Sequence, residues 1–132
     1  MTDVNDLVGV DDAVVEALDA VDEQLLTQLT DHARAEGLRS PSTYDDGSWH
    51  HAAASLGAAG MKLYVDGNLV AANAGITTAG NYTGYWRWGG GTLANMANRP
   101  SSDYLTGSLD EVAIYTTQLS DSQIKLHYQR NY

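Results

Sequence analysis

The sequence predicts a mostly β, antiparallel domain that follows an acidic helical segment and ends in a short helix. Apolar residues recur at steps of three and four before residue 40, and at alternate positions after Ser42. Glycine-containing turns separate the short apolar segments of the second part. A capping pattern precedes the last ten residues. We therefore divide the chain into an acidic helical segment, 1–41, and a β domain, 42–132.

The acidic segment is expected to form one long helix, or two short ones broken near Asp19, and to end at about Glu36, just before Gly37. One helical face carries the apolar residues Val14, Leu18, Val21, Leu25 and Leu29. Residues 1–40 hold ten acidic residues and two arginines, so this segment carries most of the net charge of −10. Two roles stay open for the helix, a cover over the sheet or a dimerising stripe.

Alternation of apolar and polar residues predicts the strands. From Trp49 to Ser55 it places His50 and Ala52 on one face and His51 and Ala53 on the other. The other predicted elements are a strand at 61–65, a tight hairpin turn at Asp66-Gly67, a strand at Leu109–Tyr115, and a terminal helix with Ser120 as N-cap, Gln123 in a capping box and Ile124 and Tyr128 facing inward.

Composition excludes several classes of partner. A net charge of −10 disfavours nucleic acids and anionic membrane surfaces, because like charges repel. No apolar run reaches the roughly 18 residues of a membrane span, and the first residues do not resemble a secretory signal. The absence of cysteine excludes disulfides and thiolate metal sites.

Four segments carry a family resemblance. DGSWHHAAASLGAAGMKLYVDGNLVA, NYTGYWRWGG, NRPSSDYLTGSLDEVAIY and LSDSQIKLHY resemble, in order and spacing, the laminin-G-like, concanavalin-A-like jelly-roll modules of bacterial secreted and surface proteins. The resemblance covers about residues 44–130 and implies part of a jelly-roll-type β-sandwich, its second half, with the acidic helix in place of the first-half strands. It also implies a non-catalytic, extracellular or cell-surface binding or adhesion module, with calcium bound in some members.

The residues that suggest catalysis do not form a catalytic pattern. His50 and His51 are neighbours on a strand, so they point to opposite faces and do not bind one ion; we expect one ring to bond a backbone carbonyl beside Ala52. Retaining glycosidases need two carboxyl groups about 5–5.5 Å apart on one side of the sugar. Asp110 and Glu111 are adjacent and point apart. We therefore expect no enzymatic activity.

The candidate ligand-binding residues lie in the aromatic- and amide-rich segment before the last predicted strand: Tyr85, Trp86, Arg87, Trp88, Asn95, Asn98, Arg99 and Tyr104. Trp86 and Trp88 share a strand face and suit stacking on sugar rings, or a place in the core. Asp103 is the candidate calcium ligand, and Ca²⁺ is the only cofactor that the sequence suggests. Asp46 and Asp66 each precede glycine and are expected in turns.

Two functions from different classes follow. The first is a lectin-like module that binds carbohydrate or a surface glycoconjugate without transforming it. The alternative is a structural or assembly module, in which the helix and an uncovered sheet face form a homodimer or larger homo-oligomer and no sugar binds.

Overall fold

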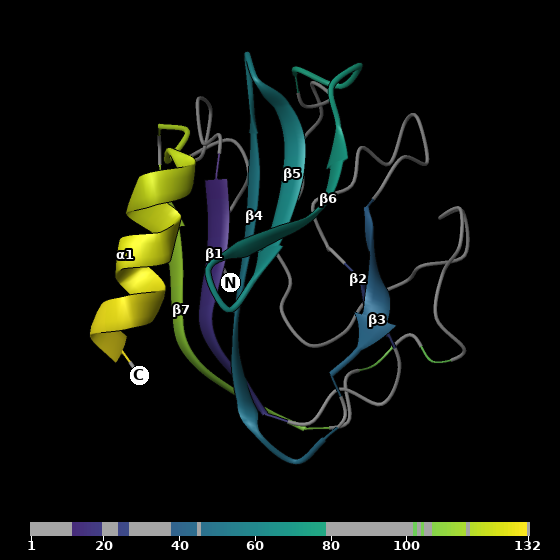
Figure 1. Ribbon diagram of the computed structural model, residues 1–132, viewed down its shortest axis with the longest axis vertical. Helices are drawn as coiled ribbons and strands as arrows, with labels where there is room; N and C mark the ends of the chain where they lie inside the picture. The colour runs from purple at the N-terminus through teal and green to yellow at the C-terminus, as the bar shows by residue number, and fades with distance from the viewer. Residues whose placement is uncertain are drawn as a thin grey trace.

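A five-stranded antiparallel sheet forms the centre of the fold (Figure 1). The computed structural model describes residues 12–19, 24–26, 38–44, 46–78, 102, 104, 107–115 and 117–131. The sheet has the order β6-β5-β4-β1-β7, with β6 at Asn68–Asn73, β5 at Gly60–Val65, β4 at Trp49–Gly57, β1 at Asp12–Asp19 and β7 at Ser108–Tyr115. A second sheet pairs β2, Gln24–Leu26, with β3, Arg39–Thr43, and the helix α1 spans Asp121–Asn131.

The predicted acidic helix is wrong for residues 12–19 and 24–26, which form β1 and β2. β1 pairs with β4 on one edge and with β7 on the other, so both of its backbone edges are satisfied by neighbours distant in the sequence. Local helical propensity is a weak preference that such pairing overrides. The expectation that a helix replaces the first-half strands is therefore also wrong.

β1 contains a bulge where it pairs with β4. Val15 lies opposite Ala52 and Leu18 lies opposite His50, so three steps along β1 match two along β4. Of the predicted helix face, Val14 lies opposite Ala53 and Leu18 opposite His50, which are on different faces of β4. The apolar step from Val14 to Leu18 therefore does not mark one face of this strand.

The two faces of β4 and β5 have different covers. On one face, Leu38 precedes β3 and Ile76 follows β6, and both pack on a buried cluster that also contains Ala54, Leu56, Met61 and Leu63. On the opposite face, Ala53 and Tyr64 pack against Ile124 of α1. The alternation predicted for β4 is therefore confirmed, since Ala53 and Ala54 belong to different clusters. Each large apolar side chain buried in this way stabilises the fold by about 1.5–3 kcal/mol.

The β5–β6 hairpin has the predicted turn. Asp66 and Gly67 have φ angles of 51° and 75°, so two consecutive residues occupy the left-handed region that a tight hairpin turn requires. The side-chain amide of Asn68 donates a hydrogen bond to the carbonyl of Asp66 at 3.1 Å. An ideal Cβ on Gly67 would lie 3.2 Å from Cδ1 of Tyr128 and 3.3 Å from Cα of Lys125, so the turn also packs closely against α1.

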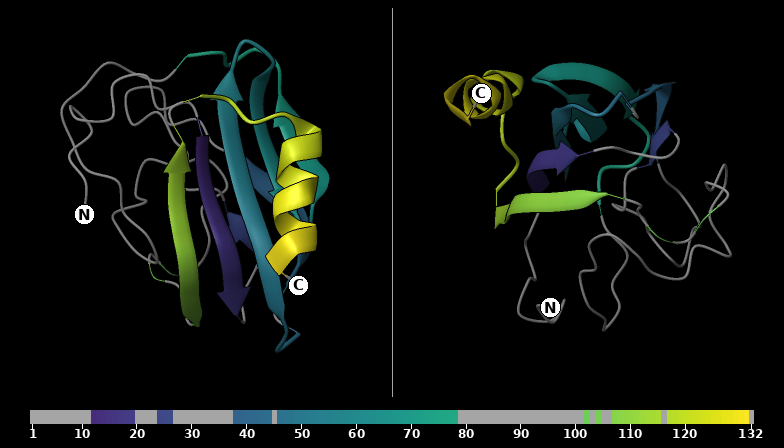
Figure 2. Two further views of the ribbon diagram at one scale, coloured as in Figure 1. Left: turned by 90° about the vertical axis from the view of Figure 1, so that its left-hand side faces the viewer. Right: turned by 90° about the horizontal axis from the view of Figure 1, so that it is seen from below.

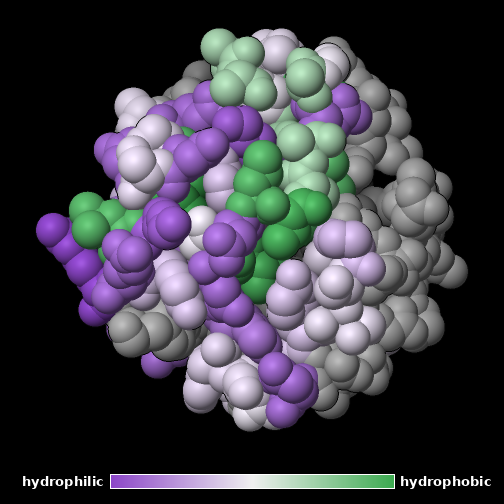
Figure 3. Space-filling model, in the orientation of Figure 1, coloured by the Kyte–Doolittle hydropathy of each residue, from purple (hydrophilic) through white to green (hydrophobic). Residues whose placement is uncertain are grey.

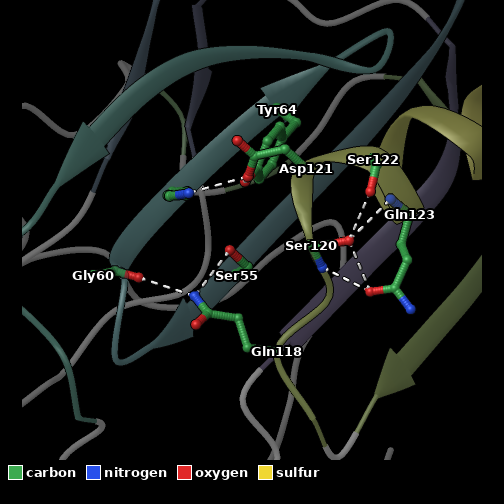
Figure 4. Close-up of polar contacts among 9 residues, drawn as sticks. Ser55, Gly60, Tyr64, Gln118, Ser120, Asp121, Ser122 and Gln123 are labelled. Atoms are coloured by element: carbon green, nitrogen blue, oxygen red, sulfur yellow. Dashed lines mark hydrogen bonds and ion pairs between the residues drawn. The ribbon is translucent and has the colours of Figure 1, made fainter.

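The predicted capping box at the start of α1 is confirmed (Figure 4). The backbone N–H of Ser120 donates to Oε1 of Gln123 at 2.8 Å, and the N–H of Gln123 donates to Oγ of Ser120 at 3.2 Å. This reciprocal pair satisfies two backbone donors that have no partner within a helix.

Polar contacts fix the first turn of α1 to β5. The carboxylate of Asp121 accepts hydrogen bonds from the hydroxyl of Tyr64 and, at 3.0 Å, from Nζ of Lys62. These bonds, that of Tyr64 first, hold the pKa of Asp121 below its ordinary value. The amide of Gln118 donates to the carbonyl of Gly60 at 3.3 Å (Figure 4). The helix therefore packs against the sheet rather than projecting away from it, as Figure 2 shows.

We expect the burial of Ile124 to hold α1 on the sheet. Ile124→Ala should lower the free energy of unfolding by about 2–5 kcal/mol, because Ile124 is 1% exposed and its loss leaves a cavity against Ala53 and Tyr64. Leu126→Ala is the matched control, because Leu126 is 42% exposed on the same helix. Urea unfolding followed by circular dichroism measures both; equal losses would contradict this packing.

Alanine substitutions at two glycines distinguish the cost of a left-handed backbone from the cost of a steric clash with the helix. Gly47 and Gly67 have φ angles of 79° and 75°, but an added Cβ meets nothing within 4 Å at Gly47. Gly47→Ala should therefore cost about 1–2 kcal/mol from the left-handed backbone alone, and Gly67→Ala should cost more because Tyr128 and Lys125 must move. Thermal unfolding of the two variants tests the order, and the reverse order would rule out close packing of the turn on α1.

Candidate functional site

One end of the sheet gathers three segments that are far apart in the sequence. Trp49 at the start of β4 lies opposite Asp19 in β1, and Asp19 lies opposite Ser108 at the start of β7. Ala52 of β4 lies opposite Val65, the last residue of β5. We call this the turn end of the sheet; it comprises the loop 44–48, the turn 66–67 and the entry into β7 at 107–108.

His50 connects the loop to the turn by two side-chain contacts. Its Nδ1 lies 2.8 Å from Oδ2 of Asp66, and its Nε2 lies 3.1 Å from Oδ1 of Asp46. The ring is largely buried, with the side chain 10% exposed, whereas the side chains of Asp66 and Asp46 are 28% and 61% exposed. The imidazole is thus held between a half-buried and an exposed carboxylate.

Asp66 also holds the backbone of the next residue of β4. Its Oδ1 accepts the N–H of His51 at 3.0 Å, and its own N–H donates to the carbonyl of His51 at 2.8 Å. One aspartate therefore ties the hairpin turn to two successive residues of β4. The prediction that Asp66 serves a turn is confirmed by this arrangement.

Asp46 closes the loop locally. Its Oδ1 accepts the N–H of Ser48 at 2.8 Å, across Gly47 with its positive φ angle. The same oxygen faces His50, so the predicted turn role of Asp46 is confirmed together with a contact that the sequence did not predict. Tyr44 completes the loop, with its ring edge-on to His50 at a centroid distance of 5.1 Å.

The electrostatics of the cluster follow from burial and hydrogen bonds. Burial of the His50 ring acts to lower its pKa, but the hydrogen bonds to Asp66 and Asp46 outweigh burial and raise that pKa above the ordinary value of 6.5. The hydrogen bond from the N–H of Ser48, followed by that from His50, lowers the pKa of Asp46. Burial, and then the charge of Asp66, raises the pKa of Tyr44.

The expected carbonyl partner of the histidine ring is wrong. His50 does share the face of Ala52, as predicted, but its ring bonds two carboxylates, because the loop and the hairpin turn each place an aspartate beside it. His51 is fully buried on the opposite face, with its ring 6.0 Å from that of Tyr128 of α1. The spacing of four residues from Asp46 to His50 was the only sequence sign of the cluster.

This cluster is suited to holding structure rather than to proton transfer with a substrate. A general base needs a ring nitrogen within reach of the substrate proton, and both nitrogens of His50 face carboxylates. Asp46 and Asp66 contact different nitrogens of the His50 ring, on opposite sides of it, so their carboxylates do not converge on a common ion. In the described part of the chain, no group of three or more His, Asp or Glu side chains is arranged to hold a metal.

The adjacent acids in β7 do not form a catalytic pair. Asp110 and Glu111 are both exposed, and the carboxylate of Asp110 accepts the backbone N–H of Glu111 at 2.8 Å. Glu111 has a φ angle of 50°, which interrupts the extended conformation of the strand. Asp110 therefore supports an irregularity in its own strand.

Most of the predicted ligand-binding residues lie outside the described residues. These are Tyr85, Trp86, Arg87, Trp88, Asn95, Asn98 and Arg99, together with the candidate calcium ligand Asp103. Tyr104 is described: it is 72% exposed, and its N–H donates to Oγ of Ser102 at 3.0 Å. The segment that contains all these residues leads into β7 at the turn end of the sheet.

The comparison with protein families identifies the superfamily. The family model described as the concanavalin A-like lectin/glucanases superfamily matches residues 14–125. The chain belongs to this superfamily. The match begins within β1 and ends within α1, so it includes strands on both sides of residue 41 and confirms the predicted resemblance. No curated protein matches the chain.

The superfamily name joins two classes of protein, lectins and glucanases, so membership alone does not separate binding from hydrolysis. It is consistent with the antiparallel sheets and the short C-terminal helix of this chain. Within the described ranges, no helix combines the length and the apolar character needed to cross a membrane.

We expect Asp66 to contribute more to stability than Asp46. Asp66→Asn should lower the free energy of unfolding by about 1–3 kcal/mol at pH 5, because its carboxylate accepts hydrogen bonds from two residues of β4. Asn tolerates the left-handed backbone at this position, so the change isolates the carboxylate. Asp46→Asn is the matched control with a smaller loss; urea unfolding with a larger loss for Asp46→Asn would contradict this assignment.

Proposed function

We propose that this protein is a non-catalytic carbohydrate-binding module of the concanavalin A-like superfamily. The observation that carries the proposal is the strand register at the turn end. Trp49 and Ser108 lie opposite the same residue, Asp19, so the loop before β4 and the entry into β7 are neighbours. The tryptophan- and amide-rich segment precedes β7 in the sequence, so the strand that follows this segment begins beside a structured loop.

The chemistry of this segment supports a sugar ligand. Trp86 and Trp88 alternate along the chain, and indole rings offer apolar faces to the C–H groups of a sugar. Asn95, Asn98 and Arg99 supply donors and acceptors for hydroxyl groups. The net charge of −10 disfavours sulfated or carboxylated glycans, so we infer a neutral sugar.

The arrangement of acids supports binding without hydrolysis. Among the described residues, Asp46 and Asp66 are engaged by His50, and Asp110 is engaged by the backbone of β7. A retaining or inverting glycosidase needs two carboxyl groups facing each other across the glycosidic bond. The adjacent acids Asp110 and Glu111 do not meet that requirement.

We also propose a location for the module and a test for a bound calcium ion. We place the module at the cell surface or outside the cell, as the resemblance to laminin-G-like modules implies. Calcium binding at Asp103 stays a prediction. Titration of the ligand in buffers with calcium and with a chelator measures whether the ion contributes to affinity.

We expect binding to depend on the two tryptophans. An array of neutral oligosaccharides identifies the ligand, and tryptophan fluorescence then gives its affinity. Trp86→Ala and Trp88→Ala should each weaken binding at least about threefold, because one aromatic contact contributes about 0.5–1.5 kcal/mol beyond buried area. Leu126→Ala, exposed on α1, is the control with unchanged affinity. Release of reducing sugar from the ligand, or unchanged affinity in both tryptophan variants, would refute the proposal.

An assembly module is the second candidate, and the edges of the large sheet favour it. β6 and β7 are its two edge strands, and each exposes an apolar residue, Leu69 at 49% and Val112 at 40%. On the surface shown in Figure 3, apolar residues gather around the position of β6 in Figure 1. Light scattering separates the candidates: a dimer that binds no sugar on the array supports assembly, and a monomer that binds sugar supports the lectin.

A further inference from the structure

We propose that Asp46, His50 and Asp66 form a pH-sensitive clasp, which fixes the loop 44–48 to the β5–β6 turn when His50 is protonated and releases the loop when His50 loses its proton. The inference goes beyond sugar binding, because it concerns the loop itself.

The geometry suits a ring that carries two protons. Nδ1 faces Oδ2 of Asp66 at 2.8 Å and Nε2 faces Oδ1 of Asp46 at 3.1 Å, and ionised carboxylates only accept hydrogen bonds. An imidazolium donates from both nitrogens, whereas a neutral imidazole donates from one. The second nitrogen of a neutral ring would turn its lone pair toward a carboxylate, and that contact is repulsive.

The surroundings decide which contact fails. Asp66 is the less exposed carboxylate, has the shorter contact with the ring and is also bonded to the backbone of His51. Asp46 is 61% exposed and lies on a short loop that water can solvate. The neutral ring should therefore keep its proton on Nδ1, toward Asp66, and the loop that carries Asp46 should separate from Nε2.

Each element next to the His50 ring contributes further groups. Tyr44 contributes a phenol whose pKa is raised, so it stays neutral over this pH range. β5 contributes Val65, and β7 contributes Leu109, both in the cluster around Ala52 and Tyr44. β1 places Leu18 opposite His50 in the register, with Asp19 next to it. Among these described neighbours, Asp46 and Asp66 are the carboxylates that contact the ring.

The direction of the pH effect follows from linkage. The pKa of His50 is raised in the folded protein relative to its ordinary value of 6.5. The stabilisation from the clasp is thus fully present below about pH 6.5 and is lost as the pH rises through the raised folded-state pKa. The loop is held below about pH 6.5 and released once the pH exceeds the raised pKa of His50 in the folded protein.

Nuclear magnetic resonance of ¹⁵N-labelled protein between pH 5 and pH 9 tests the clasp. Protection of the Ser48 amide, corrected for intrinsic exchange, should fall as His50 titrates, because the Asp46 oxygen that accepts this N–H is no longer held by the ring. The fall should be about tenfold, the size expected for the lost hydrogen bond between His50 and Asp46. Protection of the His51 amide should persist, because Asp66 keeps its partners. The ring ¹⁵N shifts at high pH should show the Nδ1–H tautomer of His50.

Two variants make the test specific. In Asp46→Asn the neutral side-chain oxygen still accepts the N–H of Ser48 and carries no charge to repel the lone pair of the neutral ring, so Ser48 protection should change little with pH. His127→Gln removes a histidine that lies beside Tyr115, and it should retain the transition of the parent protein. An unchanged transition in Asp46→Asn, an Nε2–H tautomer at high pH, or constant Ser48 protection in the parent protein would each overturn the proposal. None of these readouts uses a sugar, so failure of the clasp and failure of the proposed function are distinguishable.

Discussion

The sheet depends on the pairing of β1 along both of its edges. β1 alone connects the β4–β5–β6 group to β7, because it lies between β4 and β7 in the strand order. The helix depends on the same connection: α1 follows β7, yet its first turn bonds Tyr64 and Lys62 in β5. If β1 did not hold β7 beside β4, the capped start of α1 would not reach β5. The most acidic part of the sequence thus holds the fold together through its backbone.

The parts of the fold that follow local rules could be predicted from the sequence. Asp66-Gly67 specifies a turn because both residues tolerate positive φ angles, and Ser120 with Gln123 specifies a helix start because each side chain bonds the other's backbone. β1 obeys no local rule, because its partners lie 30 or more residues away and a bulge interrupts its register with β4. The apolar spacing of residues 12–19 therefore predicts a helix where the chain forms a strand.

The candidate site also has one part that could be predicted from the sequence and one part that could not. Alternation along β4 is enough to assign His50 and His51 to opposite faces, and opposite faces exclude a shared metal ion. The partners of His50 could not be predicted, since Asp66 reaches the ring only after β4 and β5 have paired and the hairpin turn has formed. The composition of the segment 85–99 predicts a binding surface, but composition does not fix which of its aromatic rings face solvent.

The use of carboxylates at the turn end also bears on the choice between the two classes that the superfamily name joins. A glucanase needs one carboxyl that holds a proton and a second that is free to attack or to activate water. At the turn end, Asp46 and Asp66 instead accept hydrogen bonds from a ring and from backbone N–H groups. The pKa of Asp46 is lowered by these bonds, so it is a poor proton donor. Asp46 and Asp66 therefore hold the loop before β4 and the β5–β6 turn in place, and neither carboxylate is free for the role of a catalytic carboxyl.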